Sequence, residues 1–290
     1  MTLLAVPNVS EGRDPERIAR FFGAVEESGA RVLDIHSDPF HHRSVFTIAG
    51  TDEQLVDGLA RLAVACREID LRTHLGTHPR VGALDVCPLV PHAEPMSRAV
   101  AVAHRAGREI AARAHLPVYF YGHAAKRGET RSLPELRRGG LDNLIRRAGE
   151  GLVPDEGPSI VDSVHGAVIV GARDVLIAFN VWLDAPPNVA KAIASAVRES
   201  AGGLPGVRAL GMEMGHGKSQ VSMNLVDPER TGIEEAFEAV SERAAVAGAR
   251  ATHTEIVGLI PKRLLPNPES KAARLLMKPG RSVESALAGD

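Results

Sequence analysis

Along residues 3–121, short apolar runs alternate with longer segments whose apolar residues recur at helical spacing. The short runs predict strands at residues 3–9, 31–36, 44–48, 83–90 and 117–121. The longer segments predict helices at residues 15–28, 52–69 and 95–115. Asp14-Pro15-Glu16 is a typical helix start, with a capping side chain, a proline at the first position and an acid in the first turn. The predicted order is βαββαβ, followed by one further αβ step.

The same order of elements returns in the second half of the chain. Strands are expected at residues 174–182, 207–212, 219–225 and 252–259, and helices at 187–200 and 232–248. We therefore predict an α+β protein of two ferredoxin-like βαββαβ subdomains, residues 1–172 and 173–290, each an antiparallel sheet with helices on one face. A ligand crevice is expected between them. Residues 126–170 are rich in arginine, glycine and proline and are interpreted as a helical insert followed by loops.

The composition limits the kinds of partner that the protein is expected to bind. The chain has 290 residues, of which 44% are hydrophobic and 24% charged, as in an average globular protein. A formal net charge of -2 provides no basic field for nucleic acid or an anionic membrane surface, so small-molecule substrates are the expected partners. No segment approaches the ~20 apolar residues of a membrane span, and the first residues lack a signal-peptide pattern, which favours a cytoplasmic location.

Cys66 and Cys87 fall in a helical and a strand pattern, and we expect buried free thiols at both positions. The sheet edges of ferredoxin-like units favour a homodimer.

The run His74-Leu75-Gly76-Thr77-His78-Pro79-Arg80-Val81-Gly82-Ala83-Leu84-Asp85-Val86-Cys87-Pro88 begins as a polar bend and continues as an apolar strand. Proline and glycine make such a bend costly unless its conformation is used, and a fixed arrangement of polar groups is what a catalytic site needs. His78 is the candidate general acid/base, because an imidazole that titrates near neutrality can accept a proton and return it. A histidine that only bonds to loop carbonyls is the alternative.

His74 and His78 are also four residues apart, as metal ligands on a helix would be. Gly76 and Pro79 argue against a helix there, and we expect no metal. A metal-dependent hydrolase, with a third ligand from His36, His41 or His42, is kept as a less favoured alternative.

Three further segments carry candidate chemistry. Gly215-His216-Gly217-Lys218-Ser219 lacks the leading glycine of a phosphate loop and predicts a hairpin turn. Arg137, Arg138, Arg146 and Arg147 lie on a helical pattern and are interpreted as a solvated face, or, if they face the crevice, as a site for a polycarboxylate tail. A glycine-bounded loop with hydroxyls and a carboxylate is either a lining for a flat heterocycle or a plain connection. It consists of Gly157, Pro158, Ser159, Ile160, Val161, Asp162, Ser163, Val164, His165 and Gly166.

Several of these segments resemble the glutamate formimidoyltransferase family, in particular the formiminotransferase domain of the bifunctional formiminotransferase–cyclodeaminases and its single-domain bacterial relatives. The resemblance rests on residues 6–12 (VPNVSEG), 78–88 (HPRVGALDVCP), 171–173 (GAR), 177–181 (IAFNV) and 257–261 (VGLIP). These segments follow one another in the family's order along nearly the whole chain.

The resemblance implies transfer of a formimino group from N-formimino-L-glutamate to tetrahydrofolate in histidine degradation. It places the family's catalytic histidine at His78 and its folate-binding loop at residues 157–166. An orienting carboxylate, Asp38 or Asp85, would favour the charged imidazole. Arg43 and Arg80 are the candidates for holding the substrate carboxylates.

The sequence departs from the family at two loops. His42 stands where the family has asparagine before Arg43, and the residues at 160–165 differ from the family's usual ones. A formiminotransferase-like protein that binds folate with an altered substrate, or without transfer, is therefore the second hypothesis.

Overall fold

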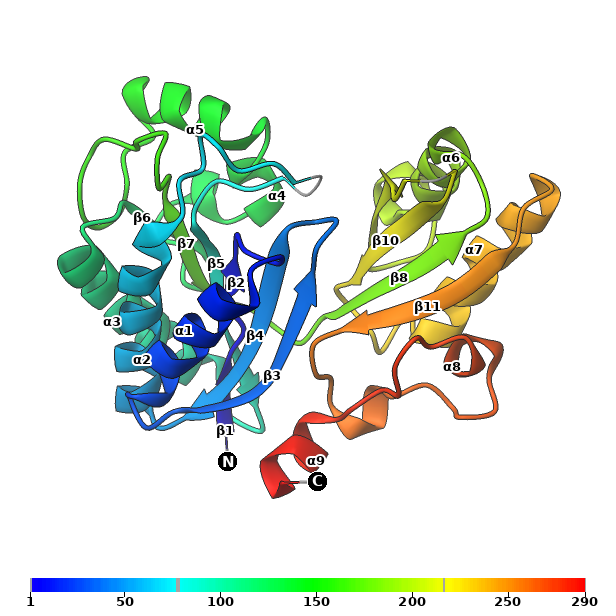
Figure 1. The fold of residues 1–290 in the computed structure, drawn as a ribbon, viewed down its shortest axis with the longest axis horizontal. Coiled ribbons are helices and arrows are strands. Elements are labelled where there is room, and N and C mark those ends of the chain that lie inside the picture. Colours follow the sequence, from blue (N-terminus) through cyan, green and yellow to red (C-terminus); the bar gives the residue numbers. More distant parts are fainter. Residues whose placement is uncertain (1, 77–78, 216, 290) are drawn as a thin grey trace. The chain divides into compact units, whose positions relative to one another are not determined.

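The chain divides into two units, Met1–Asp174 and Val175–Asp290, in a computed structural model that describes residues 2–76, 79–215 and 217–289 (Figure 1). Each unit contains a sheet with helices packed against it. The predicted α+β class is confirmed. Both cysteines are free and buried, as predicted.

The first unit is built on a seven-stranded sheet. Its strands are β1 (Thr2–Ala5), β2 (Asn8–Val9), β3 (Arg31–Asp38), β4 (Arg43–Gly50), β5 (Leu84–His92), β6 (Val118–Gly122) and β7 (Val168–Ala172). Its helices are α1 (Pro15–Glu26), α2 (Asp52–Ala65), α3 (Met96–Ala114), α4 (Leu133–Leu136) and α5 (Gly140–Gly149), with short 3-10 turns η1 (Cys66–Glu68) and η2 (Gly128–Thr130).

The strand predicted over residues 3–9 is two short strands. Both β1 and β2 lie between β4 and β5 and pair with them antiparallel. The break falls at Val6-Pro7, because Pro7 has no amide hydrogen to donate to a ladder. The backbone stays connected across the break, since Val6 N donates to Pro88 O (2.9 Å) and Phe46 N donates to Pro7 O (3.0 Å).

The expectation of a purely antiparallel first sheet is wrong. Beyond β5, the strands β7 and β6 are added in parallel, in the order β5-β7-β6. Strand β7 lies in the region interpreted as insert and loops. Its sequence, VIVGA, is a continuous apolar run without alternation, because both of its faces are buried.

Two cores lie on opposite faces of this sheet. Helices α1, α2 and α3 cover one face, where Phe21, Leu59 and Ile110 pack with Phe46 and Leu84. Helices α4 and α5 belong to the other core, where Leu136 and Leu144 pack with side chains of β5, β6 and β7. Figure 1 shows the three long helices together on their side of the sheet.

The second unit contains a four-stranded antiparallel sheet of order β11-β8-β10-β9. Its strands are β8 (Ile177–Leu183), β9 (Val207–Glu213), β10 (Ser219–Leu225) and β11 (Ala251–Val257). Its helices are α6 (Pro187–Val197), α7 (Ile233–Val246), α8 (Lys271–Arg274) and α9 (Val283–Ala288), with 3-10 turns η3 (Glu199–Ala201) and η4 (Lys262–Leu264).

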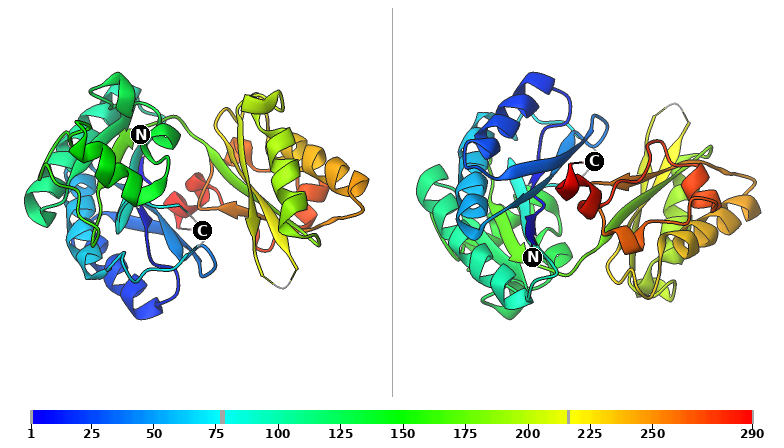
Figure 2. Two further views of the ribbon diagram at one scale, coloured as in Figure 1. Left: turned by 90° about the horizontal axis from the view of Figure 1, so that it is seen from above. Right: turned by 90° about the horizontal axis from the view of Figure 1, so that it is seen from below.

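Helices α6 and α7 cover one face of the second sheet (Figure 2), where Ile193 and Phe237 pack against Phe179 and Val181. The turn between β9 and β10 is the predicted hairpin. Met214 N donates to Lys218 O (3.1 Å), and Lys218 N donates to Gly215 O (3.0 Å). His216 in this turn lies outside the described residues.

Candidate active site

The polar bend leads into β5 in the first unit, as expected from the proline and glycine pattern. Thr77 and His78 lie outside the described residues, so the structure does not describe the candidate general acid/base itself. The residues that follow it are held by Asp85. Its Oδ1 accepts a hydrogen bond from Val81 N at 2.8 Å, which ties the bend to the strand four residues later.

The other oxygen of Asp85 is paired with an arginine from the end of α4. Arg137 Nη2 lies 2.7 Å from Asp85 Oδ2, and Arg137 also donates to Pro79 O. The Arg137 side chain is 17% exposed, so its assignment to a solvated face is wrong. Arg138 and Arg146 do lie on the surface, in ion pairs with Glu135 and Glu150.

The loop at residues 157–166 packs directly against the bend. Gly82 and Gly166 form an antiparallel bridge, Ala83 N donates to His165 O (2.9 Å), and Ala167 N donates to Val81 O (2.9 Å). Gly166 has a φ of 69°, which favours glycine. The structure thus brings the predicted folate loop beside the predicted catalytic segment.

The polar side chains of this loop are partly used within it. Asp162 Oδ1 accepts from Val164 N (2.7 Å) and His165 N (2.8 Å), while His165 Nε2 lies 3.0 Å from Arg67 O. Ile160, in contrast, is 76% exposed. The loop thus presents a large apolar side chain on its surface.

Asp38 and Arg43 face each other at the open end of the β3–β4 pair. Asp38 Oδ1 accepts from Phe40 N (2.7 Å) and His41 N (2.9 Å), so the carboxylate holds the turn between the strands. Arg43 is half-buried. Burial and the nearby charge of Arg137 lower the pKa of the Arg43 guanidinium to about 10, although Asp85 and Asp38 oppose this shift.

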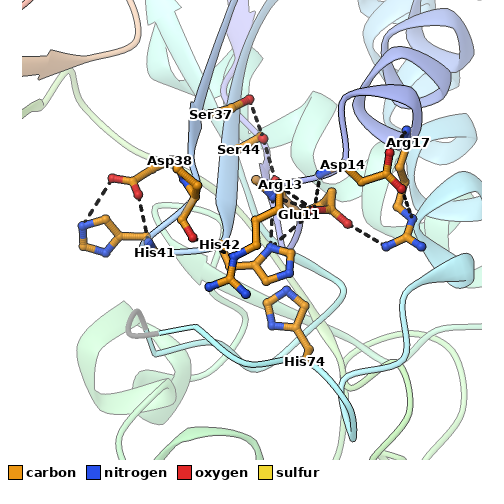
Figure 3. A network of polar contacts seen from close by, with 12 residues as sticks. Glu11, Arg13, Asp14, Arg17, Ser37, Asp38, His41, His42, Ser44 and His74 are labelled. Carbon is orange, nitrogen blue, oxygen red and sulfur yellow. Dashed lines mark hydrogen bonds and ion pairs between the residues drawn. The ribbon is translucent and has the colours of Figure 1, made fainter. Parts of the chain in front are cut away.

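Glu11, near this turn, is almost fully enclosed (Figure 3), with 1% of its surface exposed. Its Oε1 accepts from the backbone nitrogens of Gly12 (2.9 Å), Arg13 (2.9 Å) and Asp14 (3.1 Å). Its Oε2 accepts from Arg17 Nη1 at 2.6 Å. Burial raises the pKa of Glu11, but these hydrogen bonds and the neighbouring His42 outweigh burial, and the net pKa is lowered.

His42 connects Glu11 with the bend. Its Nδ1 accepts from Gly12 N (3.1 Å) and lies 3.4 Å from Glu11 Oε1. The His42 ring packs on the His74 ring with centroids 3.9 Å apart and planes inclined by 30° (Figure 3). Burial lowers the pKa of His42, and the arginines Arg13, Arg80 and Arg17 lower it further, against the opposing charge of Glu11.

His74 and Arg80, from the two ends of the bend, are in direct contact. Arg80 Nη1 contacts His74 Nδ1 and lies 3.0 Å from His74 Nε2. Burial and the charge of Arg80 lower the pKa of His74 to about 4, so this imidazole is neutral at neutral pH. Arg80 also donates to His41 O at 3.0 Å.

These contacts bear on the metal alternative. His74 faces a guanidinium, and within residues 2–76, 79–215 and 217–289 no group of three or more His, Cys, Asp or Glu side chains is arranged to hold a metal ion. Across the same residues, none of the helices combines the length and apolar character needed to cross a membrane.

Neither Glu11 nor the pairing of Asp85 with Arg137 is among the features predicted from the sequence. Glu11 carried a usable signal, because it is an acid placed between an apolar run and a helix cap, where a carboxylate can collect free backbone N–H groups. The pairing of Asp85 with Arg137 joins residues 52 positions apart and had no local signal.

Comparisons with known proteins identify the family of the chain. The family model described as "Formiminotransferase domain, N-terminal subdomain" matches residues 2–173, and the one described as "Formiminotransferase domain" matches residues 178–277. The glutamate formimidoyltransferase of Thermoplasma acidophilum is 38% identical over 270 residues, which cover 90% of this chain and 88% of that protein. The corresponding protein of Streptococcus pyogenes serotype M1 is 34% identical over 270 residues, with 90% and 89% covered.

The formimidoyltransferase-cyclodeaminase of Sus scrofa is 37% identical over 271 residues, covering 90% of this chain. The match covers 50% of that longer relative. With both units matched in order, the chain belongs to the formiminotransferase family.

Proposed function

We propose that the protein is a glutamate formimidoyltransferase. It transfers the formimino group of N-formimino-L-glutamate to tetrahydrofolate and releases glutamate, a reaction of histidine degradation. The observation that carries this proposal is the similarity along 90% of the chain to relatives of nearly the same length that bear this name. Tetrahydrofolate acts as the acceptor substrate.

His78 is proposed as the general acid/base. The attacking folate nitrogen forms a bond to the formimino carbon and gives its proton to His78. The bond between that carbon and the glutamate nitrogen then breaks, and His78 returns the proton to the departing amine. Support comes from the sequence motif and from the anchored residues that follow it, where Asp85 and Arg137 hold Val81 and Pro79.

The loop at residues 157–166 is proposed to bind the folate, with exposed Ile160 beside the pterin ring. This proposal is supported by the packing of the loop on Val81-Gly82-Ala83. Arg43 and Arg80 are proposed to hold the carboxylates of the formimino donor, because guanidinium groups pair with carboxylates bidentately. Asp85 is proposed to orient the catalytic segment, and Asp38 to hold the turn that carries Arg43.

A homodimer and a cytoplasmic location belong to the same proposal. The homodimer is proposed because edge strands of sheets can pair with a second copy of the chain.

The test is a turnover assay with purified protein, tetrahydrofolate and N-formimino-L-glutamate, in which glutamate and 5-formiminotetrahydrofolate are measured by mass spectrometry. We expect equal amounts of the two products. The variant His78→Ala is expected to lose about 10²- to 10⁴-fold in kcat. Full activity in this variant would refute the role of His78.

The second hypothesis, folate binding without this transfer, is separated by two additional measurements. One is the affinity of the protein for tetrahydrofolate, and the other is turnover with a panel of formimino and formyl amino acids. Tight folate binding without any product would favour the second hypothesis and exclude the first.

A further inference from the structure

The residues on both sides of Thr77-His78 in the sequence are anchored on the turn between β3 and β4. Arg80 donates to His41 O (3.0 Å) and to His42 O (3.5 Å). The His74 ring packs on the His42 ring at 3.9 Å between centroids. Gly76 approaches the same turn so closely that a Cβ there would lie 2.6 Å from His41 O.

The turn is itself held in an unusual backbone conformation. His42 has a φ of 50°, in the left-handed region that few non-glycine residues occupy, asparagine, aspartate and histidine being the most frequent of them. Its Nδ1 accepts from Gly12 N at 3.1 Å, so the nitrogen that faces Gly12 carries no proton. Gly12 has no room for a side chain, because a Cβ would lie 2.6 Å from Arg43 N. The ring is thereby aimed at His74.

We propose that His42 is a positioning residue: its neutral ring holds His74, and the backbone oxygens of its turn hold Arg80, so that both flanks of the intervening His78 are in place for its reaction. The catalytic part of this statement rests on the proposed function; the anchoring part does not. His42 acts through His74 and does not itself exchange a proton with substrate.

The requirement for a neutral ring follows from the charges around it. Glu11 faces Nδ1 from the loop before α1, Arg13 and Arg17 act from the same loop and helix, and His74 and Arg80 act from the bend. A proton on Nδ1 would displace the hydrogen bond from Gly12 N and turn toward Glu11. It would also place a cation beside the guanidinium of Arg80. Acidification through the pKa of His42, which lies below 6.5, therefore weakens the anchor.

The substitution His42→Asn tests the inference with little strain, because asparagine tolerates a positive φ and offers an oxygen to Gly12 N. It removes the ring and its titration. We expect amide exchange of peptides within residues 72–82 to increase roughly three- to tenfold, as for the loss of one ring–ring contact. We also expect kcat to fall by a similar factor, with KM for tetrahydrofolate changed less than about twofold.

The pH dependence separates positioning from general stability. In the parent protein, protection of these peptides, corrected for intrinsic exchange, is expected to fall as pH decreases below 6.5, with a matching loss in kcat. His42→Asn should remove that ionisation from both profiles. The control is His115→Asn, the same substitution at an exposed residue with a φ of 53° at the end of α3, which should change neither profile.

A double-variant cycle completes the test. If the two rings hold each other, His42→Asn combined with His74→Asn should be no worse than the more severe single variant. Additive effects, or an unchanged exchange profile in His42→Asn, would overturn the inference. Because exchange is measured without substrate, the anchoring is tested even if the protein transfers no formimino group.

Discussion

Arg137 Nη2 lies 2.7 Å from Asp85 Oδ2, and this ion pair joins the end of α4 to β5, the strand into which the bend leads. Both side chains are largely enclosed, with 17% and 2% of their surfaces exposed. Removing one partner of an enclosed pair leaves the other charge without compensation, which costs more than the pair itself contributes.

We therefore expect Arg137→Ala to lower the free energy of unfolding by about 3 kcal/mol. Its neighbour Arg138 forms an exposed pair with Glu135, and Arg138→Ala should lower it by less than about 0.5 kcal/mol. Urea unfolding of both variants measures the difference. Equal losses would show that Asp85 finds another partner or water when Arg137 is absent.

The buried carboxylate of Glu11 should make the free energy of unfolding decrease at acidic pH. Its pKa is lowered in the folded protein, so its contribution is present above the ordinary value of 4.5 and is lost as pH falls through the folded value. Glu11→Gln should cost about 2 kcal/mol at pH 7, because it removes hydrogen bonds to a charged group. It should also flatten the fall in unfolding free energy below pH 4.5.

Urea unfolding at a series of pH values from 7 to 3 checks this prediction. Glu16→Gln, which removes an exposed carboxylate from α1, is the matched control and should leave the curve of the parent protein unchanged within about 0.5 kcal/mol. If Glu11→Gln kept the full pH dependence of the unfolding free energy, other carboxylates would be responsible for that dependence.

His74 should contribute a second, separate pH dependence. Its pKa falls from 6.5 to about 4 on folding, because burial and Arg80 oppose its charged form. Between these values the unfolded chain binds the proton and the folded protein does not, so stability decreases as pH falls from 6.5 toward 4. In His74→Asn this part of the slope should disappear, while in His115→Asn it should remain. Thermal unfolding at pH 7 and pH 5 provides the comparison.

The close approach of Gly82 to Gly166 predicts an effect on folate binding. A Cβ at Gly82 would lie 2.6 Å from Leu84 O and would press against Ala167 O. Gly82→Ala should therefore displace the loop at residues 157–166, raise KM for tetrahydrofolate and lower the free energy of unfolding by about 1–3 kcal/mol.

The control for this substitution is Gly149→Ala in α5, where the space around a Cβ is open and alanine favours the helix. It should be neutral or slightly stabilising. An unchanged KM in Gly82→Ala would separate the loop from folate binding and redirect the search for the folate site.

The second unit could be predicted well from sequence, because its strands carry an apolar face and a polar one and its turns are marked by glycine and proline. Ser219–Leu225, for example, alternates along its length and was predicted with the boundaries found. The same rule failed for β7. A strand buried on both faces has no polar face, so its sequence lacks the period that identifies a strand.

The sequence predicts those parts of the candidate site that lie within one short segment. It does not predict contacts between residues that are far apart in the sequence. The glycine-bounded loop and the bend were recognised separately, and their packing through Gly82 and Gly166 depends on pairing over 84 positions, which has no local signal. The buried position of Arg137 has no local signal for the same reason. A basic helical segment is usually solvated, and only the position of Asp85 in the folded sheet shows that one of its arginines turns inward.

Strand β7 lies between the two cores of the first unit, so its register determines which of its side chains enter each core. Val168 and Val170 belong to the core beneath α3, whereas Ile169 packs on the opposite side with Val86. A shift of the β7 register by one residue would move each of its side chains to the opposite core and disrupt the packing of both cores. It would also carry Gly166 away from Gly82. The five buried residues of β7 therefore fix its register. This register in turn keeps Gly166, at the end of the loop, next to Gly82.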